Sequence, residues 1–141
     1  MIKMINKKNI IIIGIIIIIS TVLASGCVSN TEEPTTKVNV TEISINPADY
    51  GEYKVQMNIV PNEDFQYLGL MVIYYDDKGT VLQKDTLLWN VLDAAKGQKY
   101  SVASSSFLNE NDKPVKAELY LFDDASTFEP SNAIWNKTIN L

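Results

Sequence analysis

The sequence predicts an all-β fold, an immunoglobulin-like antiparallel β-sandwich of about seven strands over residues 37–141, preceded by an N-terminal hydrophobic signal helix. Three observations lead to this prediction. Apolar and polar residues alternate with a period of two in several short segments, and turn residues recur at intervals of roughly ten residues. After the N-terminal apolar run, no segment keeps a helical period.

Each expected strand follows from its own pattern. Residues 53–59 alternate most regularly, which is typical of a half-buried antiparallel strand. Residues 67–75 are apolar on both faces, which favours a central strand. Residues 91–96, just before Gly97, are expected to form one helical turn. The expected strands are 38–45, 53–59, 67–75, 80–89, 99–107, 115–122 and 133–141.

The composition excludes most catalytic classes before any motif is considered. The chain has 141 residues, no His, one Cys and a formal net charge of −5. Without His there is no imidazole base, no Ser-His-Asp triad and no His-bound zinc, and a single Cys excludes an internal disulfide. The acidic balance argues against a nucleic-acid partner, which requires a basic surface. We therefore expect no cofactor and no enzymatic activity.

The first 26 residues differ sharply from the rest of the chain. Eleven of the 17 Ile lie before Ser20, and three Lys precede an apolar run over residues 10–24. This is the layout of a secretory signal. A helix of about 15 residues spans roughly 22 Å, which is less than the roughly 30 Å hydrocarbon core of a bilayer. The length therefore favours a signal peptide over a stable membrane span.

The segment Leu23-Ala24-Ser25-Gly26-Cys27 resembles the lipobox of prokaryotic membrane lipoproteins, and we expect an archaeal source. The resemblance implies cleavage before Cys27, a lipid on its thiol and a location at the extracytoplasmic face of the cell membrane. Leu23 lies one position further from Cys27 than in the usual pattern. An uncleaved N-terminal anchor or a buried helix is the alternative. The resulting division is a signal peptide at 1–26, a lipidated Cys and flexible tether at 27–36, and the sandwich domain at 37–141.

Two stretches resemble the FxLYD-type immunoglobulin-like domains of microbial surface lipoproteins. Val72-Ile73-Tyr74-Tyr75-Asp76 leads into Asp77-Lys78-Gly79, where that family ends an apolar strand with an aromatic-Asp pair and a D-x-G turn. Val72 replaces the Phe of that pattern and Tyr74 replaces the Leu. Leu119-Tyr120-Leu121-Phe122-Asp123 is a second, partial match without the Gly. The resemblance supports the fold and the surface location, and it implies no common activity.

Acidic residues at the predicted turns are the candidate metal ligands. Asp76, Asp77, Asp123 and Asp124 are calcium candidates, because Ca²⁺ binds through oxygen atoms. They lack the spaced pattern of a dedicated calcium loop, and Asp is favoured in turns for its own hydrogen bonds, so we expect no metal site. The same acids provide the remote alternative of a carboxylate-dependent hydrolase, although nothing in the sequence selects a pair.

Two aromatic side chains are the candidate binding surface. If Leu119 and Leu121 face the core, Tyr120 and Phe122 face outward and could bind a glycan or an envelope protein. The alternative is that the neighbouring loop at 128–130 covers them. The surface therefore depends on how that loop folds.

Two sequons are candidate modification sites. Asn39-Val40-Thr41 and Asn136-Lys137-Thr138 have the N-x-[ST] pattern of N-glycosylation acceptors, so Asn39 and Asn136 would carry the sugar. Short sequons also occur by chance. The prediction depends on export of the chain.

No motif identifies a ligand. The interpretation that fits best is a non-catalytic cell-surface lipoprotein, a binding or structural module held at the outer face of the cytoplasmic membrane by lipid on Cys27. Its partner would be an envelope protein or a glycan. The alternative is an accessory subunit of a membrane complex or a solute-binding component.

Overall fold

The computed structural model describes residues 36–141, so the predicted signal helix and Cys27 lie outside the described residues. Residues 36–141 form seven strands and two short 3-10 helices, which confirms the all-β prediction. Neither helix in this part of the chain is long and apolar enough to cross a membrane. The strands are β1 (Val38–Pro47), β2 (Glu52–Pro61), β3 (Phe65–Tyr75), β4 (Val81–Ala94), β5 (Tyr100–Phe107), β6 (Lys116–Phe122) and β7 (Trp135–Asn140), and the 3-10 helices are η1 (Asp49–Gly51) and η2 (Pro130–Asn132).

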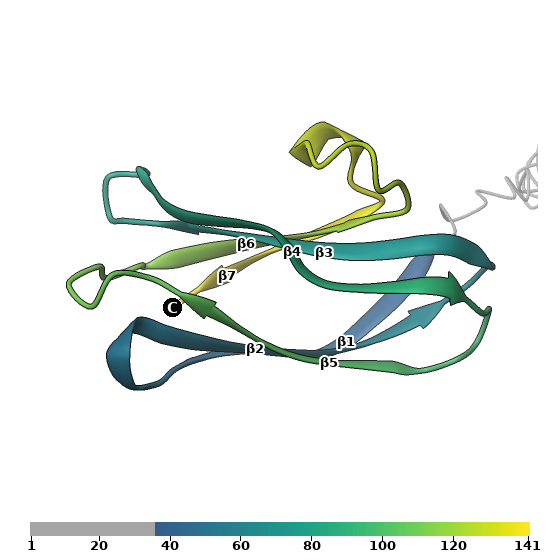
Figure 1. Cartoon of the computed structure of the whole chain (residues 1–141), viewed down its shortest axis with the longest axis horizontal. Coiled ribbons are helices and arrows are strands. Elements are labelled where there is room, and N and C mark those ends of the chain that lie inside the picture. The colour runs from purple at the N-terminus through teal and green to yellow at the C-terminus, as the bar shows by residue number, and fades with distance from the viewer. Residues whose placement is uncertain (1–35) are drawn as a thin grey trace, which may run out of the picture. The chain divides into compact units, whose positions relative to one another are not determined.

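The strands form two antiparallel sheets that pack face to face (Figure 1). One sheet has the strand order β1-β2-β5 and the other has β4-β3-β6-β7. In a constant-type immunoglobulin domain the fourth strand lies beside the fifth, whereas here β4 pairs with β3. The predicted immunoglobulin-like sandwich of seven strands is confirmed, with three strands in one sheet and four in the other.

Alternation of side chains places one face of each sheet in the core between them. Val55, Met57 and Ile59 of β2 are buried at two-residue intervals, and so are Leu119 and Leu121 of β6. Strand β3 differs because it is buried on both faces along most of its length. It lies between β4 and β6, which confirms the prediction of a central strand.

The second buried face of β3 packs beneath a loop. Met71 and Ile73 cluster with Phe122 on the outer face of the four-stranded sheet. The connection from β6 to β7, which includes η2, folds back over that sheet (Figure 1). It brings the ring of Phe128 onto that of Phe122, with the ring centroids 5.4 Å apart. Part of the outer face is therefore a second, smaller apolar core.

The prediction of a helical turn at 91–96 is wrong, because β4 continues through this segment to Ala94. Leu92 pairs with Tyr67 and Ala94 pairs with Phe65. Ala94 is fully buried. Pairing with β3 and burial outweigh the weak local preference for a turn of helix, since propensity is overridden by tertiary contacts.

The sandwich has two ends, which we call the entry end and the far end. At the entry end the chain enters β1, and Asn62 in the β2–β3 turn donates its N–H to Lys37 O at 2.9 Å. The far end holds η1, the β3–β4 turn, the β5–β6 loop and Leu141. There Leu108 donates its N–H to Gly51 O at 2.9 Å. In Figure 1 the far end lies on the left, beside the mark for the C-terminus.

Candidate functional site

The exposed aromatic pair expected at Tyr120 and Phe122 does not form. Phe122 is only 1% exposed, so its assignment to an open binding surface is wrong. The loop after β6 covers it with Phe128, as the alternative interpretation of the sequence held. The physical reason is the apolar outer face of β3, which the loop buries by folding back over it.

Tyr120 is half-buried and belongs to a polar network around Glu118. Its hydroxyl donates to Glu118 Oε2 at 2.7 Å, and the Tyr75 hydroxyl donates to the same oxygen at 2.8 Å. Lys116 Nζ donates to Glu118 Oε1 at 2.9 Å and lies 4.0 Å from the centroid of the Tyr75 ring. The carboxylate of Glu118 is therefore engaged on both oxygens by groups of the protein itself.

The protonation states of this network are set by those contacts. Burial alone raises the pKa of Glu118, but the hydrogen bonds from Lys116, Tyr120 and Tyr75 outweigh it and hold that pKa below its usual value. Burial, followed by the bond to Glu118, raises the pKa of Tyr75 to about 12 and also raises the pKa of Tyr120. Near neutral pH, an ionised carboxylate thus faces two protonated hydroxyls, an arrangement that stabilises the sheet face.

The four calcium candidates lie at opposite ends of the sandwich. Asp76 and Asp77 follow β3 at the far end, and Asp123 and Asp124 follow β6 at the entry end, because β3 and β6 run antiparallel. Asp76 Oδ1 accepts the N–H groups of the turn at 2.9 and 2.7 Å, and Asp124 Oδ1 accepts one at 2.7 Å. These backbone bonds lower the pKa of both carboxyls. Within residues 36–141, no three acidic side chains group closely enough to hold a metal ion.

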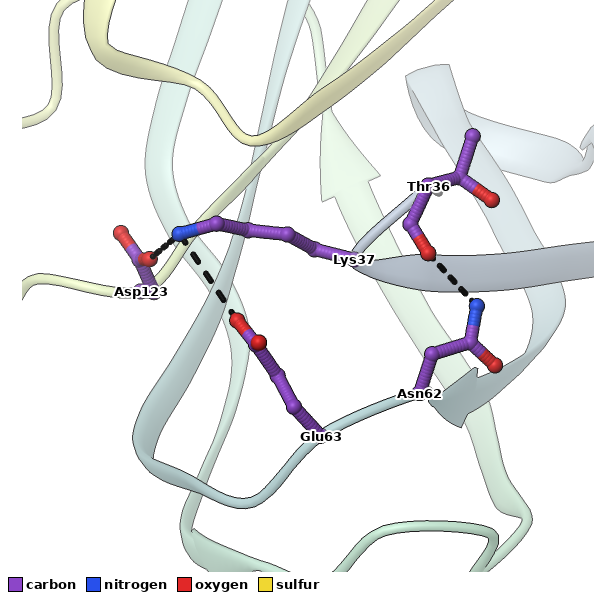
Figure 2. Close-up of polar contacts among 5 residues, drawn as sticks. All are labelled: Thr36, Lys37, Asn62, Glu63 and Asp123. Carbon is purple, nitrogen blue, oxygen red and sulfur yellow. Dashed lines mark hydrogen bonds and ion pairs between the residues drawn. The ribbon is translucent and has the colours of Figure 1, made fainter. Parts of the chain in front are cut away.

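The residues that open the domain are held by long-range polar contacts (Figure 2). Lys37 Nζ donates to Asp123 Oδ2 at 2.9 Å and lies 3.8 Å from Glu63 Oε1. Asn62 Nδ2 donates to Thr36 O at 2.6 Å. No local pattern predicts this cluster, because its members come from three separate segments. It fixes where the chain enters the sandwich.

Polar atoms also gather where β4 and β5 meet. Ser104 Oγ donates to Leu88 O at 2.8 Å. An adjoining cleft of about 410 Å³ is lined by residues 84–88, Ser104 and Ser105. Asp85 Oδ2, Tyr74 OH and Ser106 Oγ are buried without a hydrogen-bond partner among residues 36–141, and burial raises the pKa of Tyr74 to about 12. Buried groups of this kind typically bind ordered water. The serines of this cleft have no His to activate them as nucleophiles.

The far end carries apolar side chains that the sequence analysis did not single out. Large apolar residues exposed there are Tyr50 at 83%, Phe107 at 65%, Val81 at 52%, Val115 at 41% and Leu141 at 41%. A period-two signal could have found Phe107, because it lies an odd number of residues after the buried Val102 and so faces the other way. The others lie in turns or at strand ends, where alternation makes no prediction.

Backbone contacts bring three of these residues together. Val81 pairs with Tyr75. Val115 donates its N–H to Tyr75 O at 2.9 Å, and Leu141 donates its N–H to Val115 O at 2.9 Å. Three exposed aliphatic residues therefore follow one another across the end of the four-stranded sheet. Tyr50, with a φ of 59°, precedes Gly51, whose carbonyl oxygen accepts the N–H of Leu108 just after β5 on the other sheet.

The loops of the far end are acidic. Segments 49–51, 76–80 and 108–115 contain five acidic residues and two Lys, a net charge of −3. The acids are Asp49, Asp76, Asp77, Glu110 and Asp112, and the bases are Lys78 and Lys113. The exposed apolar residues are thus surrounded mainly by negative charge.

No family model and no curated protein matches the chain. Among solved structures, the chain is similar to a DUF1425 family member from Shewanella sp. pv-4, with 22% identity, a TM-score of 0.45 and coverage of 64% of this chain and 81% of that chain. It is also similar to part of the GH3 β-glucosidase of Bifidobacterium adolescentis, with 8% identity, a TM-score of 0.41 and coverage of 74% of this chain and 17% of that one. The β-glucosidase DesR from Streptomyces venezuelae gives 13% identity, a TM-score of 0.42, and coverage of 76% and 15%. TM-scores below 0.5 at such identities carry no argument about function.

Proposed function

We propose that the chain is a non-catalytic, lipid-anchored module at the extracytoplasmic face of the cell membrane, and that it binds a partner protein through its far end. The lipobox-like segment that ends at Cys27 supports the anchor. The five exposed apolar residues at the far end carry the proposal of binding. These residues lie at the opposite end of the domain from the point where the chain enters β1.

Exposed apolar residues that lie in a group favour binding of a partner. Leaving a large apolar side chain in water forgoes about 1.5–3 kcal/mol relative to its full burial. Single exposed apolar residues are ordinary on protein surfaces, whereas a group of them surrounded by polar residues is typical of an interaction site. Tyr and Phe are also residue types enriched at the centres of protein interfaces.

Charge indicates the chemistry of the partner. The net charge of −3 on the far-end loops favours a partner with an apolar centre and a rim of Lys or Arg. The same charge disfavours insertion of this end into an anionic membrane surface, because the acidic side chains would be repelled. We therefore take the partner to be an envelope protein with a basic rim.

Site-specific photo-crosslinking in native membranes tests this proposal. A photoreactive phenylalanine analogue is placed at Phe107 or Tyr50, with Leu92 as the matched control. Phe107 and Leu92 are 65% and 67% exposed, but Leu92 pairs with Tyr67 toward the entry end. We expect one discrete adduct from both far-end positions and none from Leu92. Equal labelling from all three positions, or no adduct, overturns the proposal.

The partner identified in this way is then purified and titrated. We expect Phe107→Ser to weaken binding about tenfold or more, because a central aromatic contributes more than about 1.4 kcal/mol at an interface. Leu92→Ser should leave the affinity unchanged. A one-to-one complex would favour the accessory-subunit form of the proposal over a free surface module.

The anchor is tested separately by mass spectrometry of the chain from membranes. We expect the chain to begin at a lipid-modified Cys27. Recovery of intact Met1 in the membrane form would contradict the lipoprotein assignment.

A further inference from the structure

The two sequons, far apart in the sequence, lie on the same side of the sandwich. Asn39 is on β1, an edge strand of the three-stranded sheet, and Asn136 is on β7, an edge strand of the four-stranded sheet. The other two edge strands, β4 and β5, contact each other through the hydrogen bond from Ser104 Oγ to Leu88 O. Strands β1 and β7 therefore form the opposite side, which we call the β1/β7 edge.

The sequons also lie at the same end. Asn39 is two residues after Lys37, whose Nζ bonds to Asp123 at 2.9 Å. Asn136 pairs with Tyr120 of β6, three residues before Asp123. The ion pair between Lys37 and Asp123 thus connects the start of the strand that carries Asn39 to the end of the strand that pairs with Asn136. Both sequons therefore belong to the entry-end part of the β1/β7 edge.

Both acceptor side chains face solvent, Asn39 on the outer face of the three-stranded sheet and Asn136 on the outer face of the four-stranded sheet. Asn39 is exposed beside the buried Val38, so it points away from the core on the three-stranded sheet. On β7, Trp135 and Ile139 pack against the core, so Asn136 points outward from the four-stranded sheet. Glycans on the two positions would flank the edge from either side.

We infer that Asn39 and Asn136 both carry N-linked oligosaccharides, which together shield the β1/β7 edge. In each case Asn Nδ2 forms a bond to the anomeric C1 of an oligosaccharide diphosphate donor. The C1–O bond to the diphosphate breaks, the diphosphate leaves with the electron pair, and one Nδ2 proton passes to a base of the transferring enzyme. This inference rests on the extracytoplasmic location in the proposed function, because such acceptors are modified in exported chains.

Glycans at these two positions would shield the edge strands β1 and β7 from other chains. An edge strand presents unpaired N–H and C=O groups that can pair with another chain. Polar, bulky sugars beside β1 and β7 would prevent such pairing. The glycan on Asn136 would start next to Tyr120, its cross-strand neighbour, and cover the sheet face there. The far end, several residues along both strands, would stay accessible to a partner.

Peptide mass spectrometry of the full chain from native membranes tests the inference, with controls built into the sequence. Cleavage after Lys gives one peptide of residues 38–54 and another of residues 117–137. The first contains Asn39 and the non-sequon Asn46, and the second contains Asn136 and the non-sequon Asn132. We expect added sugar mass on Asn39 and Asn136, with Asn46 and Asn132 unmodified.

Substitutions of the Thr in each sequon test whether the sugar depends on the sequon, in a domain that still folds. Thr41 and Thr138 are exposed, so Thr41→Ala and Thr138→Ala should fold normally and lose the sugar at their own sites. Thr41→Ser and Thr138→Ser should keep it. A thermal melt of each variant confirms folding.

The same spectra distinguish this inference from the proposed function. Unmodified Asn39 or Asn136 in a chain that carries lipid on Cys27 overturns the glycan inference and leaves the anchor intact. Sugar that persists after both Thr→Ala changes also overturns it. Sugar on both Asn in a chain without lipid on Cys27 supports the glycan inference and contradicts the anchor instead.

Discussion

Lys37 and Asp123 are 86 positions apart in the chain, yet Lys37 Nζ donates a hydrogen bond to Asp123 Oδ2 at 2.9 Å (Figure 2). The pair joins the start of β1, in one sheet, to the loop that follows β6 in the other. The bond to Asp123 raises the pKa of Lys37, so the amine stays charged. The contact links the two sheets at the entry end of the sandwich.

A double-mutant cycle with Lys37→Met and Asp123→Asn should give a small coupling energy. The two side chains are 49% and 31% exposed, and pairs of this kind contribute about 0.2–1 kcal/mol. Urea unfolding at low and high salt measures the coupling, which should decrease with salt. Lys99→Met, at an exposed position, is the control for the loss of a Lys. A coupling of several kcal/mol would contradict the view of a solvent-screened pair.

Leu119→Ala should destabilise the domain by about 2–5 kcal/mol, because it leaves a cavity at a fully buried position between the sheets. Leu92→Ala removes the same atoms from a side chain that is 67% exposed. Its effect should stay within about 0.5 kcal/mol. Urea unfolding of the two variants provides the comparison, and equal losses would show that the core is not where we place it.

Gly51→Ala should cost more stability than Gly79→Ala. Both glycines have positive φ, 75° and 80°, so an added Cβ strains the backbone by about 1–2 kcal/mol in each. A Cβ on Gly51 would also collide with the carbonyl oxygen of Leu108, whereas a Cβ on Gly79 meets open space. Thermal melts of the two variants should therefore differ clearly. A similar loss in both would mean that η1 can move away from the β5–β6 loop.

Glu118→Gln should destabilise the domain at neutral pH and much less in acid. The folded-state pKa of Glu118 lies below its usual value, so the folded chain binds fewer protons than the unfolded chain. This contribution to stability is present above the unfolded pKa and is lost as the pH falls through the folded pKa. Melting temperatures of the wild type and Glu118→Gln, measured from pH 7 down to about pH 3, should converge. A constant difference across that range would contradict the assigned role of the carboxylate.

The phenol of Tyr75 should lose its proton at a higher pH than an ordinary tyrosine does. Its pKa is raised to about 12, first by burial and then by the bond to Glu118. Ultraviolet difference titration should show the phenol absorbance of wild type rising above pH 11 for this side chain. In Glu118→Gln the rise should move toward lower pH, because the negative neighbour is gone. Tyr75→Phe identifies the signal.

Most of the fold could be predicted from local pattern. Alternation in 53–59 and the doubly apolar 67–75 correspond to β2 and to the central strand β3. The segment 91–96 could not be predicted, because Val91, Leu92 and Ala94 pair with residues of β3 that lie 23 to 29 positions earlier in the chain. The candidate sites were less predictable than the strands. Alternation assigned Phe122 correctly to the outer face of its strand, but it says nothing about a loop that covers that face.

Composition and periodicity by themselves determined that this chain has no imidazole chemistry and that residues 37–141 form a sandwich. These properties depend on residue type and on neighbours two positions apart, which the sequence displays directly. The lipoprotein signal rests instead on the resemblance of residues 23–27 to a lipobox, and it stays a prediction. Only the tertiary structure decided which side chains are exposed and which distant residues meet. It buried Phe122, joined Lys37 to Asp123, gathered apolar residues at the far end and placed Asn39 and Asn136 along one edge. The physical reason is that burial and pairing depend on how the loops and sheets pack, and those contacts form between residues that no local pattern connects.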